Sequence, residues 1–149
     1  MEQLDRIEEM LMNIPTKMCR NMDHRFVNII LKSISKELAK HHFMILRMLM
    51  EKDKFYVTEI VQTLGITKSQ MTASVDKLLL LGYVDRYADT HDRRKIFISI
   101  TEEGKEITKK IYTLIKKRFT EDIQMLTKEE LDDLEKGLKV LIKFCSLND

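Results

Sequence analysis

Apolar residues in the middle of the chain recur at helical spacing in three successive segments, residues 39–50, 57–64 and 67–82. Apolar positions three and four residues apart share one face of a helix, so each segment predicts a helix with a buried face. Gly65 follows the second segment, where a left-handed residue ends many helices, and Thr67 with Gln70 fits a capping box that starts the third. Two short helices joined by a turn that contains glycine are typical of a helix-turn-helix motif.

After the third helix the period of the pattern becomes that of a strand. Isoleucines alternate with other residues over residues 95–100, which predicts a half-buried strand. Residues 83–87 can pair with it, and residues 55–57 can form a further short strand. The intervening loop, residues 88–94, is too long for a tight turn and carries two adjacent arginines. A hairpin directly after a helix-turn-helix is a wing, so we expect a winged helix-turn-helix unit over residues 39–104.

Both ends of the chain carry narrow apolar stripes with alternating spacings of three and four. Pro15 interrupts the first stripe, which leaves either a kinked helix or two helices with a break near residues 13–15, and a second stretch runs to about Ile34. Narrow stripes favour packing against another helix, so we expect residues 1–36 and 105–149 to supply dimerisation helices. The stripes consist of Leu4, Ile7, Leu11, Ile14 and Met18, and of Leu131, Leu134, Leu138, Leu141 and Cys145.

Two further helix starts can be located in the C-terminal third. Thr127 can cap the last helix, with Glu130 closing a capping box. Thr101 opens another long helix, whose first turn is acidic and whose outer face is strongly basic. This face either stays solvated or attracts DNA or an acidic surface. Over residues 105–118 the charged residues are Lys105, Lys109, Lys110, Lys116, Lys117 and Arg118, against Glu106 alone.

The composition supports a mostly helical chain. Of its 149 residues 34% are charged, and only one is Pro and four are Gly. This composition is typical of helical proteins, because helices tolerate Lys and Glu but not Gly or Pro. No apolar run reaches the roughly 18 residues that span a bilayer, and the acidic N-terminus differs from a signal peptide, so we expect a cytoplasmic protein without membrane contact. Cys19 and Cys145 fit neither a disulfide framework nor a zinc ribbon. Phosphate loops and the common hydrolase motifs are absent from the sequence, so we expect no enzyme and no cofactor.

Several motifs, in their order and spacing over about residues 39–104, resemble the MarR family of transcription regulators. The resemblance implies a mostly α (α+β) fold, with a winged helix-turn-helix domain between N- and C-terminal dimerisation helices. It also implies a homodimer on a palindromic operator in double-stranded DNA, acting as a repressor that a small-molecule effector releases. The motifs are residues 57–60, 64–69, 75–78, 81–86, 92–94 and 100–104, which read VTEI, LGITKS, VDKL, LGYVDR, DRR and ITEEG.

The predicted recognition helix offers small and polar side chains opposite its apolar stripe, as a helix in the major groove requires. Gln70 could read adenine, Thr72 could contact a phosphate or a thymine methyl, and Lys77 should meet phosphate. Ala73 stands where many members of that family carry a basic residue, so we expect no guanine contact there. The whole predicted face comprises Lys68, Ser69, Gln70, Thr72, Ala73, Ser74 and Lys77.

The predicted wing carries Arg93 and Arg94 at its tip, where an arginine can enter a narrow minor groove. We expect Arg94 to do so. Asp92 would repel phosphate, but its carboxylate can instead hold Arg86 or Arg94 in a salt bridge. These four residues form the predicted DNA-binding part of the wing.

Three alternatives concern regulation and partners. Cys19 lies beside Lys17 and Arg20, whose charges could lower the pKa of its thiol and make it a redox sensor. Zinc sensing would need the scattered histidines, of which only His41 shares a helix face with an acidic residue, Glu37; the further candidates are His24, His42, His91 and Cys19. A winged helix that contacts only protein would need neither the arginines of the wing nor a polar recognition face.

Overall fold

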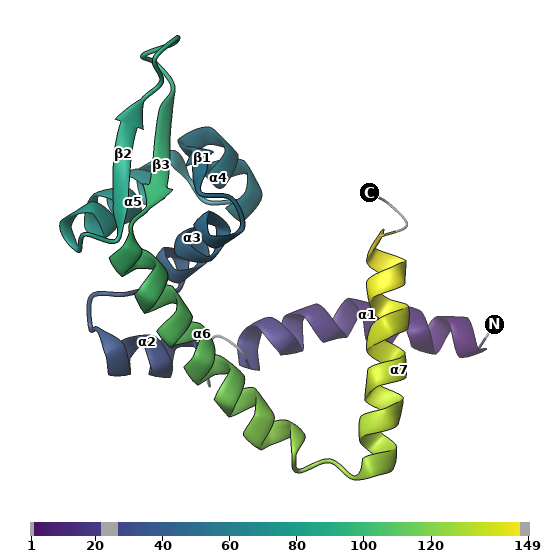
Figure 1. Ribbon diagram of the computed structural model, residues 1–149. Coiled ribbons are helices and arrows are strands. Elements are labelled where there is room, and N and C mark those ends of the chain that lie inside the picture. Colours follow the sequence, from purple (N-terminus) through teal and green to yellow (C-terminus); the bar gives the residue numbers. More distant parts are fainter. Residues whose placement is uncertain (1, 22–26, 147–149) are drawn as a thin grey trace. The chain divides into compact units, whose positions relative to one another are not determined.

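The computed structural model describes residues 2–21 and 27–146, and Figure 1 shows its elements. The chain divides into two compact units, Met1–Leu114 and Ile115–Asp149, which we describe separately. None of the described helices is both long and apolar enough to span a membrane. In chain order the elements are α1 (Glu2–Asn21), α2 (Asn28–Ile34), α3 (Lys40–Glu51), β1 (Lys54–Tyr56), α4 (Val57–Leu64), α5 (Lys68–Leu80), β2 (Val84–Ala88), β3 (Ile96–Ile100), α6 (Glu102–Ile123) and α7 (Lys128–Cys145).

The core of the first unit lies between α3, α4, α5 and a small sheet. Each of these elements contributes side chains that are almost completely removed from water, which is the main favourable contribution to folding. The predicted helical periodicity is thereby confirmed for α3, α4 and α5. The most deeply buried apolar side chains of these elements are Ile45, Leu46, Leu49, Ile60, Met71, Leu78, Val84 and Ile98.

The sheet is antiparallel and has the strand order β1-β3-β2. Val84 lies opposite Ile100 and Ala88 opposite Ile96, so β2 and β3 form the predicted hairpin, which projects from the helices in Figure 1. The first strand ends one residue earlier than predicted. The N–H of Tyr56 donates to Glu59 Oε2 at 2.7 Å, a capping bond that starts α4 directly at Val57.

The start of α6 is fastened to the start of the hairpin. The Thr101 hydroxyl donates to the Gly82 carbonyl at 2.7 Å and accepts from the Gly104 N–H at 3.0 Å, while the Thr101 N–H donates to the Tyr83 carbonyl at 3.1 Å. A Cβ atom at Gly104 would overlap the Tyr83 carbonyl. Only glycine therefore lets α6 approach Tyr83, directly before β2, so closely.

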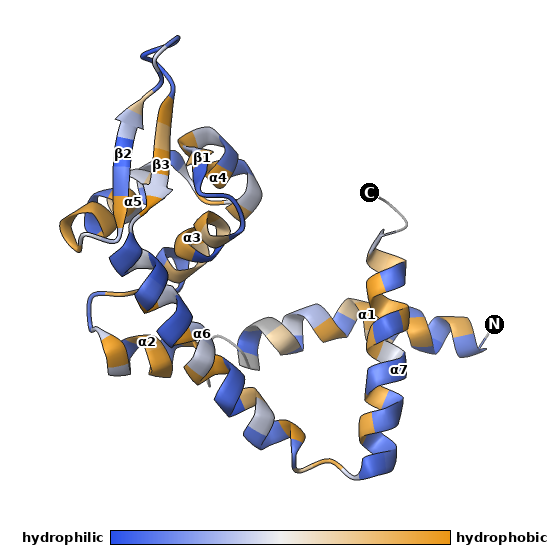
Figure 2. Cartoon of the chain, viewed as in Figure 1, coloured by the Kyte–Doolittle hydropathy of each residue, from blue (hydrophilic) through white to orange (hydrophobic). Residues whose placement is uncertain are grey.

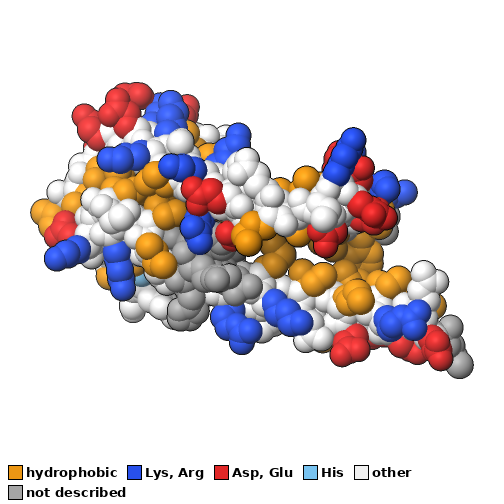
Figure 3. All heavy atoms as spheres, turned by 90° about the horizontal axis from the view of Figure 1, so that it is seen from below, with side chains coloured by type: hydrophobic (Ala, Val, Ile, Leu, Met, Phe, Trp, Pro, Cys, Tyr) orange, Lys and Arg blue, Asp and Glu red, His pale blue; other side chains and the backbone are white. Residues whose placement is uncertain are grey.

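The terminal helices keep their apolar stripes exposed. A single helix, α1, continues through Pro15, so of the two alternatives the one with separate helices and a break near residues 13–15 is wrong; proline removes one helical N–H, and the remaining turns continue. Along α1 and α7 apolar and charged stretches alternate in Figure 2, and Figure 3 shows apolar side chains on the surface beside charged ones. No residue of α7, from Lys128 to Cys145, is buried. The exposed apolar residues of these helices include Leu4, Ile7, Met10, Ile14, Leu134, Leu138, Val140 and Ile142.

Candidate nucleic-acid interface

The helix predicted to read DNA is α5, and its first turn is fixed by the predicted capping box. Gln70 N–H donates to Thr67 Oγ1 at 3.1 Å, and Thr67 N–H donates to Gln70 Oε1 at 2.9 Å. Gly65 precedes this start with φ of 61°, a left-handed conformation that ends α4. The side-chain oxygen that Gln70 would offer to adenine is therefore already occupied in the free protein.

The polar face of α5 is narrower than the sequence predicted. Lys68, Ser69, Thr72 and Ala73 are exposed, and the Thr72 hydroxyl donates to the Lys68 carbonyl at 3.0 Å, which leaves its methyl group for an apolar contact. The placement of Ser74 on this face was wrong. Only 1% of Ser74 is exposed, and its hydroxyl donates to the Gln70 carbonyl at 2.6 Å.

Two cations predicted to contact DNA form ion pairs within the protein. Lys77 Nζ lies 2.8 Å from Glu37 Oε1, in the segment between α2 and α3, and the lysine side chain is largely covered. Arg86 Nη1, on β2, lies 3.7 Å from Asp76 Oδ1 on α5. These pairs connect the recognition helix to its neighbours on both sides. They also reduce the positive charge that either cation offers to a phosphate, so its contact with DNA remains a proposal.

The tip of the wing has a defined geometry built on two aspartates. Asp92 Oδ1 accepts from both the N–H and the Nε–H of Arg94 at 3.1 Å. The predicted partnership of Asp92 is thus found with Arg94, while Arg86 pairs elsewhere. These bonds to Arg94 lower the pKa of Asp92, which stays ionised. Arg93 and Arg94 are both exposed, so the fork of Arg94 is aimed by Asp92 and open to solvent.

The second of these aspartates, Asp89, was missed by the sequence analysis. Asp89 Oδ2 accepts from the Tyr56 hydroxyl at 2.8 Å, and Asp89 Oδ1 accepts from the backbone N–H of His91 at 2.7 Å. An aspartate that begins a loop and bonds two residues ahead is a recognisable turn signal, so its bond to His91 could have been predicted. The bond to Tyr56 joins residues 33 apart in the chain, and no local pattern indicates it.

Some residues of the redox and metal alternatives lie in the described part of the structure and others lie outside it. Cys19 belongs to α1, but its side chain lies outside the described part of the structure, as does His24. Within residues 2–21 and 27–146 no three His, Cys, Asp or Glu side chains gather in a group that could hold a metal ion. His42 is buried, its Nδ1 accepts from the Ala39 N–H at 3.0 Å, and burial lowers its pKa from 6.5 to about 4, helped by the charges of His41 and Lys77. This neutral imidazole acts as a helix cap.

The chain resembles known regulators in sequence and in fold. YpoP of Bacillus subtilis, an uncharacterised HTH-type transcriptional regulator, is 38% identical over 80 residues, which are 54% of this chain and 57% of that protein. The HTH-type transcriptional repressor YetL of the same organism is 35% identical over 97 residues, 64% of this chain and 54% of that protein. The chain thus spans little more than half the length of these two relatives.

Solved structures extend the likeness beyond the winged helix. The transcriptional regulator BldR of Sulfolobus solfataricus superposes with a TM-score of 0.74 at 26% identity, over 96% of this chain and 99% of that one. A MarR mutant from E. coli, solved in complex with operator DNA, gives a TM-score of 0.66 at 21% identity, over 90% of this chain and 95% of that one, which shows the shared fold. Residues 38–95 match the sequence profile of the MarR family. The winged helix-turn-helix unit of this chain is therefore a member of the MarR family.

Proposed function

We propose that the protein binds double-stranded DNA at specific sequences and regulates transcription. The carrying observation is the wing tip, where Asp92 holds the exposed fork of Arg94 in one orientation. A pre-oriented arginine suits a narrow minor groove, while the exposed residues Lys68, Ser69 and Thr72 of α5 suit the adjacent major groove. The names of the relatives, and the neighbour solved with operator DNA, support this function.

The acting form in this proposal is a homodimer on a palindromic operator. Both α1 and α7 expose an apolar stripe along their length, for example Leu4 at 70% and Leu138 at 45%. Stripes of this kind are stable in water when a second helix covers them, and a second copy of the chain supplies one. Two recognition helices would then read half-sites whose centres lie about 10 base pairs apart. We expect repression, the role that the name of YetL carries.

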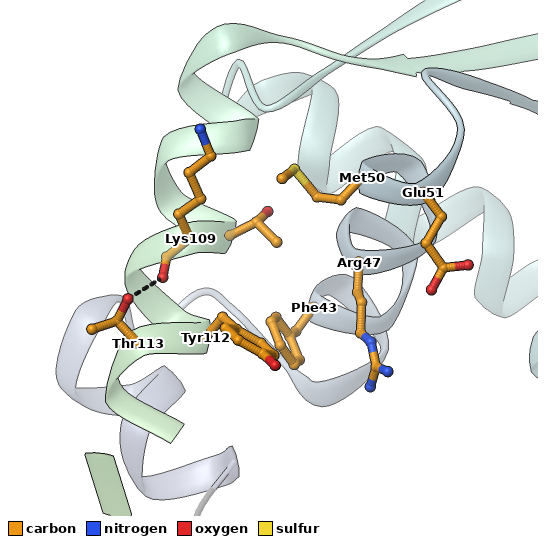
Figure 4. Close-up of a pocket in the computed structure, with 8 residues that line it drawn as sticks. Phe43, Arg47, Met50, Glu51, Lys109, Tyr112 and Thr113 are labelled. Carbon is orange, nitrogen blue, oxygen red and sulfur yellow. Dashed lines mark hydrogen bonds between the residues drawn. The ribbon is translucent and has the colours of Figure 1, made fainter. Parts of the chain in front are cut away.

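Release by a small effector has a candidate place in the first unit. A pocket of about 370 Å³ opens between α3 and the first half of α6, and Figure 4 shows its lining. Phe43, Met50 and Tyr112 give it apolar walls. Arg47 and Lys109 bring two positive charges to its rim against the one negative charge of Glu51. Such a lining suits a small molecule with an apolar body and an anionic group. Because α6 is fastened to the hairpin at Thr101, a ligand that moved α6 would also disturb the wing.

Replacement of Arg94 by alanine tests the DNA-binding proposal. A duplex selected by the wild-type protein from a random library serves as the probe, and binding is measured by gel shift over a salt series. We expect Arg94→Ala to weaken binding about tenfold or more and to flatten the salt dependence. Arg6→Ala removes the same charge from α1 and should leave affinity within about twofold. Equal affinities for Arg94→Ala and wild type contradict the minor-groove role. A wild type that selects no sequence contradicts DNA recognition and favours a module for protein contacts.

The effector proposal needs a different comparison. A compound that releases the wild-type protein from the selected duplex should lose its effect on Arg47→Ala or Lys109→Ala, while both variants still bind the duplex. Variants that respond like wild type would exclude this pocket as the effector site.

A further inference from the structure

The wing is tied to the first strand of the sheet by a tyrosine. Tyr56 belongs to β1, and its hydroxyl donates to Asp89 Oδ2 at the base of the wing loop, at 2.8 Å. Its ring stacks on Phe97 of β3, with centroids 4.0 Å apart and an interplanar angle of 24°. Stacking fixes the plane of the ring, so the direction in which the hydroxyl points is set by the sheet.

Asp89 passes this constraint on to the loop. While Oδ2 accepts from Tyr56, Oδ1 accepts from the N–H of His91 at 2.7 Å and of Asp92 at 3.2 Å. The N–H of Asp89 donates to the Lys95 carbonyl at 2.9 Å, which closes the loop at its base. Asp92 in turn orients Arg94. A chain of hydrogen bonds therefore runs from β1 to the arginine at the tip.

Two lysines complete the arrangement. Lys95 Nζ lies 5.6 Å from the centroid of the Tyr56 ring, and Lys54 Nζ lies 5.1 Å from that of Phe97. An ammonium group over an aromatic face is held there by the ring quadrupole. Both lysines are exposed. The stacked pair thus fixes positive charge beside the wing as well as the shape of the loop.

We infer that Tyr56, which lies outside the recognition helix and outside the wing, is a positioning residue for DNA recognition: it holds Asp89, and through Asp89 and Asp92 it sets the orientation of Arg94. This inference rests on the proposed function and assigns a residue that controls its specificity. The hydrogen bond that Tyr56 donates to Asp89 raises the pKa of Tyr56. The bonds from the His91 N–H and then from Tyr56 lower the pKa of Asp89, so the donor stays protonated and the acceptor ionised at neutral pH.

Tyr56→Phe removes the hydroxyl and keeps the ring stack, which makes it the informative variant. Tyr87→Phe is the matched control. Tyr87, on β2, lies opposite the same Phe97 of β3, but its hydroxyl donates to Asp85 and accepts from Ser99 and makes no bond to the wing loop. The first readout needs no DNA. Trypsin cleaves after Arg93 and Arg94, and the rate of cleavage at these bonds in the folded protein reports how firmly the loop is held. We expect Tyr56→Phe to be cut about three to ten times faster, as loss of one hydrogen bond implies, and Tyr87→Phe to match wild type.

The second readout is affinity for a duplex selected by the wild-type protein from a random library. We expect Tyr56→Phe to bind about three to ten times more weakly and to lose preference at the base pairs beneath the wing. In the Arg94→Ala background the same change should have no further effect, because its action passes through Arg94. A residue that merely stabilised the fold would weaken both backgrounds equally.

The outcomes separate this inference from the proposed function. If wild type selects an operator and Tyr56→Phe binds it equally well, or is cut by trypsin at the wild-type rate, the inference is overturned while the proposed function stands. If wild type selects no duplex, the proposed function fails and the role of Tyr56 in recognition fails with it. Faster cleavage together with weaker binding that vanishes in the Arg94→Ala background supports the inference.

Discussion

Two amphipathic helices of this chain, α3 and α7, have similar sequence patterns and opposite surroundings. In α3, four apolar side chains are buried against the rest of the winged helix-turn-helix unit, whereas α7 is longer and buries none of its residues. Leu46 is fully buried, while 45% of Leu138 is exposed. The pattern in each helix predicts a face that must be covered. It does not say whether the same chain or another one covers it, and this difference yields the predictions below.

Removal of the Leu46 side chain should have the largest effect. Leu46→Ala leaves a cavity in a closed core, and we expect the free energy of unfolding to fall by about 3 to 4 kcal/mol. Urea unfolding followed by circular dichroism measures this. Leu138→Ala is the matched control in α7. It should show its effect through protein concentration, as a weaker self-association measured by analytical ultracentrifugation. Equal losses at all concentrations for both variants would contradict the difference between the two helices.

A methyl group added at Gly104 should lower the stability of the protein. Gly104→Ala in α6 places Cβ against the Tyr83 carbonyl, so we expect it to destabilise the winged unit by about 2 to 3 kcal/mol. The melting temperature measures the change. A stable Gly104→Ala variant with unaltered DNA affinity would show that α6 can move away from Tyr83 without consequence for DNA binding.

Acid should weaken the winged unit through His42. The imidazole has a pKa of about 4 when folded and 6.5 when unfolded, so between these values the unfolded chain binds the proton first. Stability therefore falls as pH decreases from about 6.5 to about 4, and the loss should reach about 3 kcal/mol at most. His42→Gln keeps an acceptor for the Ala39 N–H and should remove this pH dependence, whereas His91→Gln, at an exposed site, should retain it. Urea midpoints of the wild type and of both variants, measured from pH 4 to pH 7, show which variant loses the pH dependence.

The smallest predicted effect is a gain in α7. Nothing lies within 4 Å of a Cβ atom built at Gly137, so Gly137→Ala meets no obstacle and reduces the entropy of the unfolded chain. We expect a stabilisation of about 0.5 to 1 kcal/mol, seen as a small rise in melting temperature. A loss of stability or of self-association would place a partner helix directly against this position.

The sequence predicted elements better than contacts between them. The bounds of α4 and the starts of α5 and α7 follow from local signals, since a capping box involves residues three apart, and Thr127 with Glu130 forms the bond expected of it. Ser74 was misplaced although the signal was available. It lies three residues after Met71 and four before Leu78, which puts it on the buried face.

Contacts that depend on tertiary structure were beyond the sequence. The pairing of Lys77 with Glu37 joins residues 40 positions apart, and the bond from Tyr56 to Asp89 joins a residue of β1 to a residue of the wing loop. Charge pattern alone made Lys77 a phosphate contact, because each lysine on an exposed helix face looks equally available. Which cations the fold neutralises is decided by elements that pack from elsewhere in the chain.

The capping bond of Gln70 bears on how α5 would discriminate between bases. In the free protein Gln70 Oε1 accepts from both the N–H and the hydroxyl of Thr67, so turning the side chain toward a base sacrifices both bonds. A base edge that offers one hydrogen bond replaces only one of the two that are given up, whereas adenine, which offers two, replaces both. The start of the helix thus sets a threshold that a weakly matching base pair does not pass, and discrimination comes from the bonds already made as much as from the bonds to DNA.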